Sequence, residues 1–123
     1  MSNAENTHPS LPGTAVLACS GTGNNGELGD RLARRLQKEG LAKMYSIAQI
    51  STKISSSSRL AMTPKVLVID GCHSGCASKC LEDMGYSDFD IWDIREHIDL
   101  DDREFTEEDL EEALVLVKKR LGV

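Results

Sequence analysis

The sequence predicts a three-layer α/β fold in which four parallel strands form one sheet with helices on both faces. Short apolar runs alternate along the chain with amphipathic helical patterns, which is the order that a parallel sheet requires. The clearest run, Lys65 to Ile69, is apolar at every position after its lysine, as in a strand buried on both faces. A chain of 123 residues is long enough for one such domain and too short for two ordinary ones.

The first half of the chain supplies two strands and two helices. A buried strand is predicted at Thr14 to Ala18, before a glycine-rich stretch. A helix is predicted from Glu27 to a stop at Gly40, because leucines recur at intervals of four residues. A weaker strand follows at Lys43 to Ile50, and a serine-rich helix is predicted over 51–62.

The second half repeats the alternation after the strand at Lys65 to Ile69. Apolar side chains at helical spacing predict a short helix from Cys76 to a stop at Gly85. Phe89 to Ile94 reads as a fourth strand, and Arg95 to Glu104 as a polar, acidic connection. The last helix is marked by Thr106 with an aspartate three residues later, the pattern of a capping box.

Right-handed crossovers between these strands predict the sheet order 2-1-3-4, a Rossmann- or flavodoxin-like arrangement. Ligands of such sheets bind beyond the carboxyl ends of the strands, where the strand order reverses. Here that point lies between the first and third strands. Cys19 follows the first strand and Cys72 follows the third, so two distant segments are expected to bring thiols to one crevice.

Residues 1–13 have no periodic pattern and are expected to form a flexible tail, which leaves 14–123 as a single domain. A net charge of −6 argues against nucleic acid and anionic membranes as partners. The beginning of the chain lacks the pattern of a secretory signal, so we expect a cytoplasmic protein. The sequence names no partner and leaves a homo-oligomer open.

Four cysteines are the feature that most needs a function: Cys19 stands alone, and Cys72, Cys76 and Cys80 lie within nine residues. In a reducing compartment such a cluster favours a metal site over structural disulfides. Cys76 and Cys80 are one helical turn apart, which suits a thiolate site for Zn(II), and an iron–sulfur cluster is also compatible. Two alternatives stay open. In the first, Cys19 would be an activated thiolate in a redox enzyme or sensor. In the second, Cys76 and Cys80 would be buried side chains that pack in the core and have no chemical role.

A glycine-rich turn follows the first strand and matches G-x-G-x-x-G, with Gly21, Gly23, Asn24 and Gly26 as candidate residues for binding a nucleotide or an anion. The second strand is not followed by the acidic residue that would bind a ribose. A plain turn, with Asn24 or Asn25 capping the helix, is therefore the favoured interpretation. In an intermediate case, backbone N–H groups of the turn would bind an anion or lower the pKa of Cys19.

Three motifs occur in an order and at spacings that resemble the DGC-domain family, prokaryotic proteins named for an Asp-Gly-Cys motif. They are Cys19-Ser20-Gly21, Gly26-Glu27-Leu28, and Ile69-Asp70-Gly71-Cys72 with Cys76-Ala77. The resemblance covers about Val16 to Trp92. It implies a small α/β domain that binds zinc through clustered cysteines, with no established activity.

By this resemblance Cys19, Cys72 and Cys76 match family cysteines, while Ser46 stands where the family commonly has another. Cys80 would then complete a four-thiolate zinc site, and without it the site would have three thiolates and an open position. Asp70 is expected either to cap the strand end or to accept a hydrogen bond beside the metal.

Overall fold

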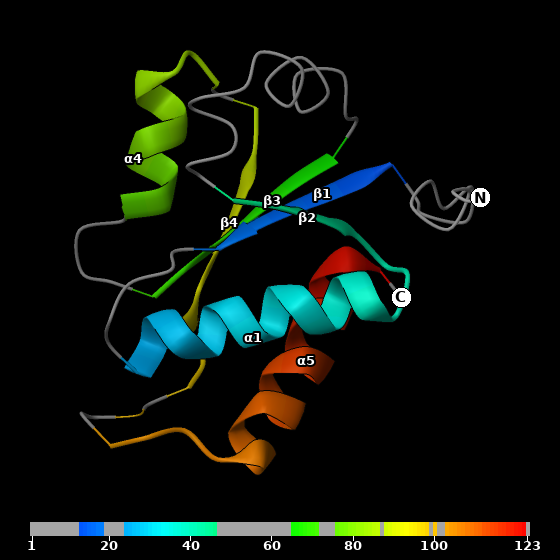
Figure 1. Cartoon of the computed structure of the whole chain (residues 1–123), viewed down its shortest axis with the longest axis vertical. Coiled ribbons are helices and arrows are strands. Elements are labelled where there is room, and N and C mark those ends of the chain that lie inside the picture. Colours follow the sequence, from blue (N-terminus) through cyan, green and yellow to red (C-terminus); the bar gives the residue numbers. More distant parts are fainter. Residues whose placement is uncertain are drawn as a thin grey trace.

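The computed structural model describes residues 13–18, 24–46, 65–71, 76–86, 88–98, 100 and 103–122. Its four strands form one parallel sheet in the order β2-β1-β3-β4, which confirms the predicted topology (Figure 1). The strands are β1 (Thr14–Ala18), β2 (Lys43–Tyr45), β3 (Lys65–Asp70) and β4 (Asp90–Asp93). The two central strands, β1 and β3, are therefore covered on both faces and carry the apolar runs that a buried parallel sheet requires.

Helices cover both faces of the sheet. The helices α1 (Asn24–Lys38) and α5 (Glu107–Leu121) lie together on one face, and α4 (Cys76–Asp83) lies on the other (Figure 1). A short 3₁₀ helix, η1 (Ile94–Glu96), directly follows β4. Within the described part of the chain, no helix is long and apolar enough to cross a membrane.

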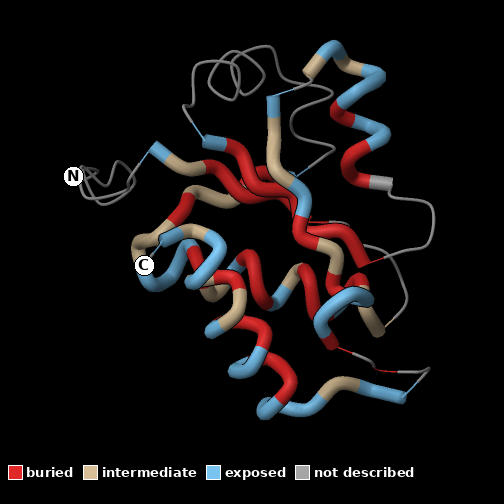
Figure 2. The backbone as a smooth tube through the Cα atoms, turned by 180° about the vertical axis from the view of Figure 1, so that it is seen from behind, coloured by how far each residue is buried: buried red, intermediate tan, exposed pale blue. Residues whose placement is uncertain are grey.

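Two apolar clusters hold the layers together, and the tube drawing shows the buried segments concentrated in the strands and on the inner sides of the helices (Figure 2). The larger cluster joins the sheet to α1 and α5, with Leu32, Trp92 and Val117 among its buried members. The smaller cluster joins the sheet to α4 through Ala77 and Leu81. Alternation of side chains along each strand divides the sheet between these clusters, since Val16 faces one and Leu17 the other.

Helix α1 approaches the sheet closely at Gly29. A Cβ atom there would lie 3.3 Å from Cδ1 of Ile94 and 3.4 Å from Cγ2 of Ile69. A side chain at this position would therefore press against the sheet and against the residue that begins η1. The absence of a side chain lets the first half of α1 lie flat on the strand ends that it covers.

The sequence misplaced several element boundaries. Helix α1 begins at Asn24 rather than Glu27, and β2 ends at Tyr45, with Ser46 already outside the strand. The fourth strand is limited to Asp90–Asp93, because Ile94 turns into η1. The predicted helix over 51–62 lies outside the described residues, as does the tail up to residue 12.

The connection after β4 is not the purely polar segment that its composition suggested. Ile94, Ile98 and Leu100 are all buried in the larger cluster. Ile98 and Leu100 stand singly among polar and charged residues, so the composition of this segment did not indicate that they are buried. His97 is exposed but its ring stacks on the buried ring of Trp92, with centroids 4.5 Å apart and planes 1° from parallel.

Candidate functional site

The register of the sheet brings two candidate segments to one edge. Ala18, the last residue of β1, is paired with Ile69 in β3, and Asp70 then ends β3. Cys19 directly follows Ala18 in the sequence, and Cys72 comes two residues after Asp70. Cys19 and Cys72 lie outside the described residues, so their convergence stays a prediction. The strand ends from which both segments leave do lie side by side.

Asp70 joins the end of β3 to the start of α4. Its carboxylate is buried and, among the described residues, accepts hydrogen bonds from the backbone N–H of Ala77 to Oδ1 at 3.2 Å and from Oγ of Ser78 to Oδ2 at 2.7 Å. The first turn of α4 contains no acidic residue of its own. Asp70 therefore supplies the negative charge that a helix N-terminus favours, and it caps α4 from the neighbouring strand. Asp70 was expected to cap the strand end or to accept a hydrogen bond beside a metal; its observed partners belong instead to the first turn of α4, and the role beside a metal stays a prediction.

Gly71, the residue after β3, lies against the first turn of α1. A Cβ atom on Gly71 would lie 2.7 Å from the carbonyl oxygen of Asn25 and 3.0 Å from its Cβ atom. Such distances are shorter than van der Waals contact, so only glycine fits without moving α1. Within the Asp-Gly-Cys motif, the aspartate thus anchors α4 and the glycine admits the first turn of α1.

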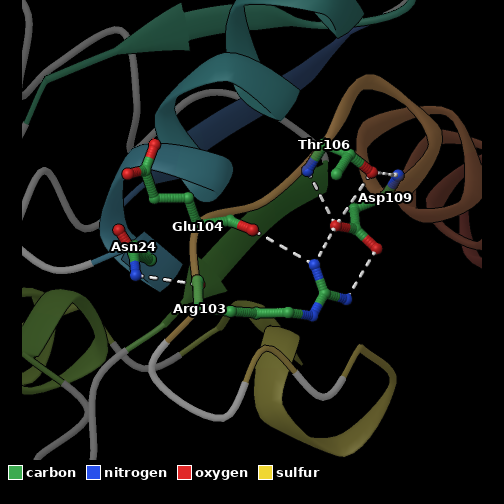
Figure 3. A network of polar contacts seen from close by, with 5 residues as sticks. All are labelled: Asn24, Arg103, Glu104, Thr106 and Asp109. Carbon is green, nitrogen blue, oxygen red and sulfur yellow. Dashed lines mark hydrogen bonds and ion pairs between the residues drawn. The ribbon is translucent and has the colours of Figure 1, made fainter.

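The first turn of α1 also contacts the segment that precedes α5 (Figure 3). The side-chain amide of Asn24 donates a hydrogen bond of 2.8 Å to the carbonyl oxygen of Arg103. The guanidinium of Arg103 in turn binds both carboxylate oxygens of Asp109, at 2.8 and 3.1 Å. These contacts connect the start of α5 to the start of α1, and through Gly71 to the end of β3.

Asp109 is the centre of this network. Its carboxylate accepts from the backbone N–H of Thr106 while the Thr106 hydroxyl accepts from the N–H of Asp109, so the predicted capping box is confirmed (Figure 3). The hydrogen bond from Arg103, followed by that from the backbone of Thr106, holds the pKa of Asp109 well below its usual range. The carboxylate is therefore charged at all ordinary pH values.

The candidate nucleotide or anion residues are only partly described. Gly21 and Gly23 lie outside the described residues, and Gly26 is buried within α1. Asn24 and Asn25 were expected to cap α1, but both lie inside its first turn. Oδ1 of Asn25 is buried and has no hydrogen-bond partner within the described part of the chain.

The two helical cysteines lie in α4 as predicted. Cys76 is the first residue of the helix, and only its backbone is described. Cys80 lies one turn later and is an exposed free cysteine. Ala77 follows Cys76 and Leu81 follows Cys80, and both of these apolar side chains face the sheet. The inert-packing interpretation is thereby wrong for Cys80, whose side chain is not part of the apolar cluster. In the ranges that the structure describes, no group of three metal-binding side chains gathers.

Comparison with known proteins identifies the family. The family model of the DGC domain matches residues 15–117. The chain belongs to the DGC domain family. Among curated proteins, it is 36% identical over 74 residues to the anaerobic and virulence modulator AnvM of Pseudomonas aeruginosa strain PAO1. That alignment covers 59% of this chain and 56% of the relative, so the chain spans little more than half the length of the curated relative that it matches.

No solved structure was found to match the chain. Family membership supports metal binding at the level of the family and does not name the metal. The sequence missed two parts of the site, namely Ser78 as a partner of Asp70 and the contact of Gly71 with Asn25. Neither could be read from spacing alone, because both depend on how α4 and α1 lie across the sheet.

Proposed function

We propose that this DGC-domain protein binds Zn(II) through Cys19, Cys72, Cys76 and Cys80 at the carboxyl edge of its sheet. The observation that carries the proposal is the register of β1 with β3, which starts the Cys19 and Asp70-Gly71-Cys72 segments from neighbouring strand ends. The close contact at Gly71 adds to it, since the chain leaves β3 pressed against the first turn of α1. Membership of the DGC family supports a metal as the ligand.

The donor chemistry fits zinc better than a disulfide. Side chains at i and i+4 of a helix have Cβ atoms about 5–6 Å apart, whereas a disulfide needs roughly 3.5–4.5 Å. Cys76 and Cys80 are therefore too far apart to bond directly while α4 stays helical. Two sulfurs that each lie about 2.3 Å from one zinc ion are bridged more easily. The exposure of Cys80 leaves its thiol available for this.

The ligand set decides what the site can do. Four thiolates around zinc make a closed site, which stabilises the fold, whereas three leave a position for an exchangeable ligand. Zinc would hold the strand ends and the start of α4 together. Because cysteine thiols must lose their protons to bind zinc as thiolates, binding would release protons, and the affinity for zinc would weaken as the pH falls.

The first test is metal analysis of protein purified anaerobically without chelator. We expect about one zinc per chain and no visible absorption, with zinc lost in the Cys72→Ser and Cys76→Ser variants. Visible absorption typical of an iron–sulfur cluster would show that the cysteines bind such a cluster and not zinc. A metal-free chain that stays empty after reconstitution with zinc would overturn metal binding, and rapid alkylation of Cys19 would then favour a thiol enzyme or sensor.

A second experiment asks whether Cys80 is the fourth ligand. Ser46 is exposed and follows β2, whose last residue Tyr45 is paired with Leu17 of β1. We expect Cys80→Ser to weaken zinc binding by about tenfold or more, and the added change Ser46→Cys to restore it. Ser46→Ala in the same background is the matched control and should restore nothing. Unchanged affinity in Cys80→Ser would show a site of three thiolates.

A further inference from the structure

Helix α5 has an inner face that packs in the core and an outer face that the fold leaves exposed. The inner face is apolar, and its buried residues belong to the larger cluster: Leu110, Ala113, Leu114 and Val117. The outer face carries four exposed residues at intervals of four, three and four positions: Glu108, Glu112, Val115 and Lys119. Residues at these intervals lie in one row along a helix, and we call this row the outer stripe.

Val115 is the apolar member of the outer stripe. It is 54% exposed, which is more than any other large apolar residue in the described ranges. A single exposed apolar side chain is common and does not by itself indicate a contact. The charges on either side of Val115 carry the argument, because both acidic residues of the stripe precede it and the basic one follows it.

The charges next to Val115 differ from those that lie beside them on the same helix. Glu111 and Lys118 form ion pairs of 2.9 and 2.7 Å with side chains of α1. Glu112 and Lys119 each follow one of these residues by one position and point away from α1. Among the residues that the structure describes, neither Glu112 nor Lys119 has a side-chain ion pair or hydrogen bond. Both charges are therefore available to a partner.

A second copy of α5 complements this stripe when a two-fold axis passes through Val115. In such an antiparallel pair, Glu112 lies three residues before the axis and Lys119 lies four residues after it. With a rise of about 1.5 Å per residue, Glu112 of one copy and Lys119 of the other differ in height by only about 1.5 Å. The symmetry forms this contact twice. A parallel pair would instead place Glu112 beside Glu112, and like charges repel.

The net charge of the chain makes this orientation selective. Each copy carries a charge of −6, so two copies repel each other in most orientations. The antiparallel pair is favourable because α5 is acidic in its first turn and basic in its last turn. One helix face from each copy is a small contact surface, which is typical of weak and reversible association.

We propose that the outer stripe of α5 is a self-association surface that joins two copies of this chain in a weak antiparallel dimer. Glu112 of each copy pairs with Lys119 of the other, and the two Val115 side chains meet at the axis. The proposal does not depend on the zinc site. Helix α4 lies on the opposite face of the sheet and stays outside the contact (Figure 1).

The test is sedimentation velocity of the full chain over a range of concentrations at one ionic strength. We expect the wild type to show an equilibrium between monomer and dimer. Lys119→Glu should weaken the dimer by about tenfold or more, because both intermolecular pairs become repulsive. Val115→Asp should weaken it as well, since it places two like charges at the axis. Lys79→Glu is the matched control, because it makes the same change of charge at an exposed site on α4.

An exchange of charges between two variants identifies the surface. Glu112→Lys alone should weaken the dimer as Lys119→Glu does. An equimolar mixture of these two variants should dimerise, because opposite charges then meet in both pairs. Wild-type protein that stays monomeric up to about 1 mM would overturn the proposal. A dimer that Lys119→Glu and Lys79→Glu weaken equally, or a mixture that stays monomeric, would show that α5 is not the contact.

Discussion

The layer of α1 and α5 and the layer of α4 cover opposite faces of one sheet, but their polar contacts lie in different places. Between α1 and α5, the ion pairs of Arg35 with Glu111 and of Glu39 with Lys118 lie at the surface. The buried carboxylate of this layer, Asp109, is bonded at the start of α5 and not to the sheet. On the α4 side, the polar contact is the buried carboxylate of Asp70. Exposed ion pairs contribute little because water screens them, whereas a buried carboxylate tolerates no lost partner.

The difference teaches where stability and specific geometry reside in this fold. The large apolar cluster and the long helices α1 and α5 provide most of the buried surface. Helix α4 has eight residues and a small cluster, so it contributes less to stability and more to the position of one strand end. Cys76 and Cys80 belong to α4, which lies on the side with the smaller cluster.

The largest effects are expected from truncating one leucine in each cluster. Leu32 and Leu81 are both fully buried, and each Leu→Ala change should destabilise the protein by about 2–5 kcal/mol. We expect the loss of stability in Leu32→Ala to lie near the upper end of this range, because the long helices α1 and α5 keep the resulting cavity from collapsing. Leu81→Ala should lie near the lower end, since short α4 can shift toward the sheet. Urea unfolding monitored by circular dichroism gives both values, and an equal loss would remove the proposed difference between the layers.

A smaller loss of stability, with one identifiable contact as its cause, is expected at Gly71. Gly71→Ala places a Cβ atom 2.7 Å from the carbonyl oxygen of Asn25, and this backbone contact must open. We expect a loss of about 1–3 kcal/mol. Gly29→Ala is the matched comparison, because its Cβ atom meets only flexible side chains at 3.3 Å or more and should cost less. A larger loss at Gly29 than at Gly71 would contradict the close contact.

The capping box of α5 should give the smallest of the three effects. Thr106→Ala removes the hydroxyl that accepts from Asp109 and should cost about 1 kcal/mol. Asp109 adds a dependence on pH: its folded pKa lies below the ordinary 3.8, so its contribution is complete above that value and is lost as the pH falls through the folded pKa. The gap in urea midpoint between wild type and Asp109→Asn should therefore close as the pH is lowered from neutral into this acid range. A gap that stays constant down to acid pH would show that the charge of Asp109 is not involved.

Much of the fold was predictable because strong local patterns agree with the tertiary structure. The strand Thr14–Ala18 and the capping box of Thr106 with Asp109 lie where the sequence placed them. The order of the strands followed from the handedness of the crossovers. In each of these cases, the deciding information lies within a few residues or in a rule of chirality.

The errors have a common physical cause, since tertiary packing decided them. Ile98 and Leu100 are buried in the larger cluster although they lie in a polar, acidic segment, which no local period could show. The partners of Asp70 and the glycine at 71 likewise depend on distances between elements. The positions of Cys19 and Cys72 stay predictions, while the sequence was right to expect Asp70 at a strand end and Cys80 on a helix.

The stacked pair of Trp92 and His97 contains an intrinsic fluorophore, the indole of Trp92. Trp92 is the single tryptophan of the chain, and it is paired with Ile69, one residue before Asp70. Its indole is buried in the larger apolar cluster, and the imidazole of His97 is stacked on it. Fluorescence from this one ring therefore reports on the strand ends directly, so that changes at the candidate site can be followed in the natural protein without an added dye.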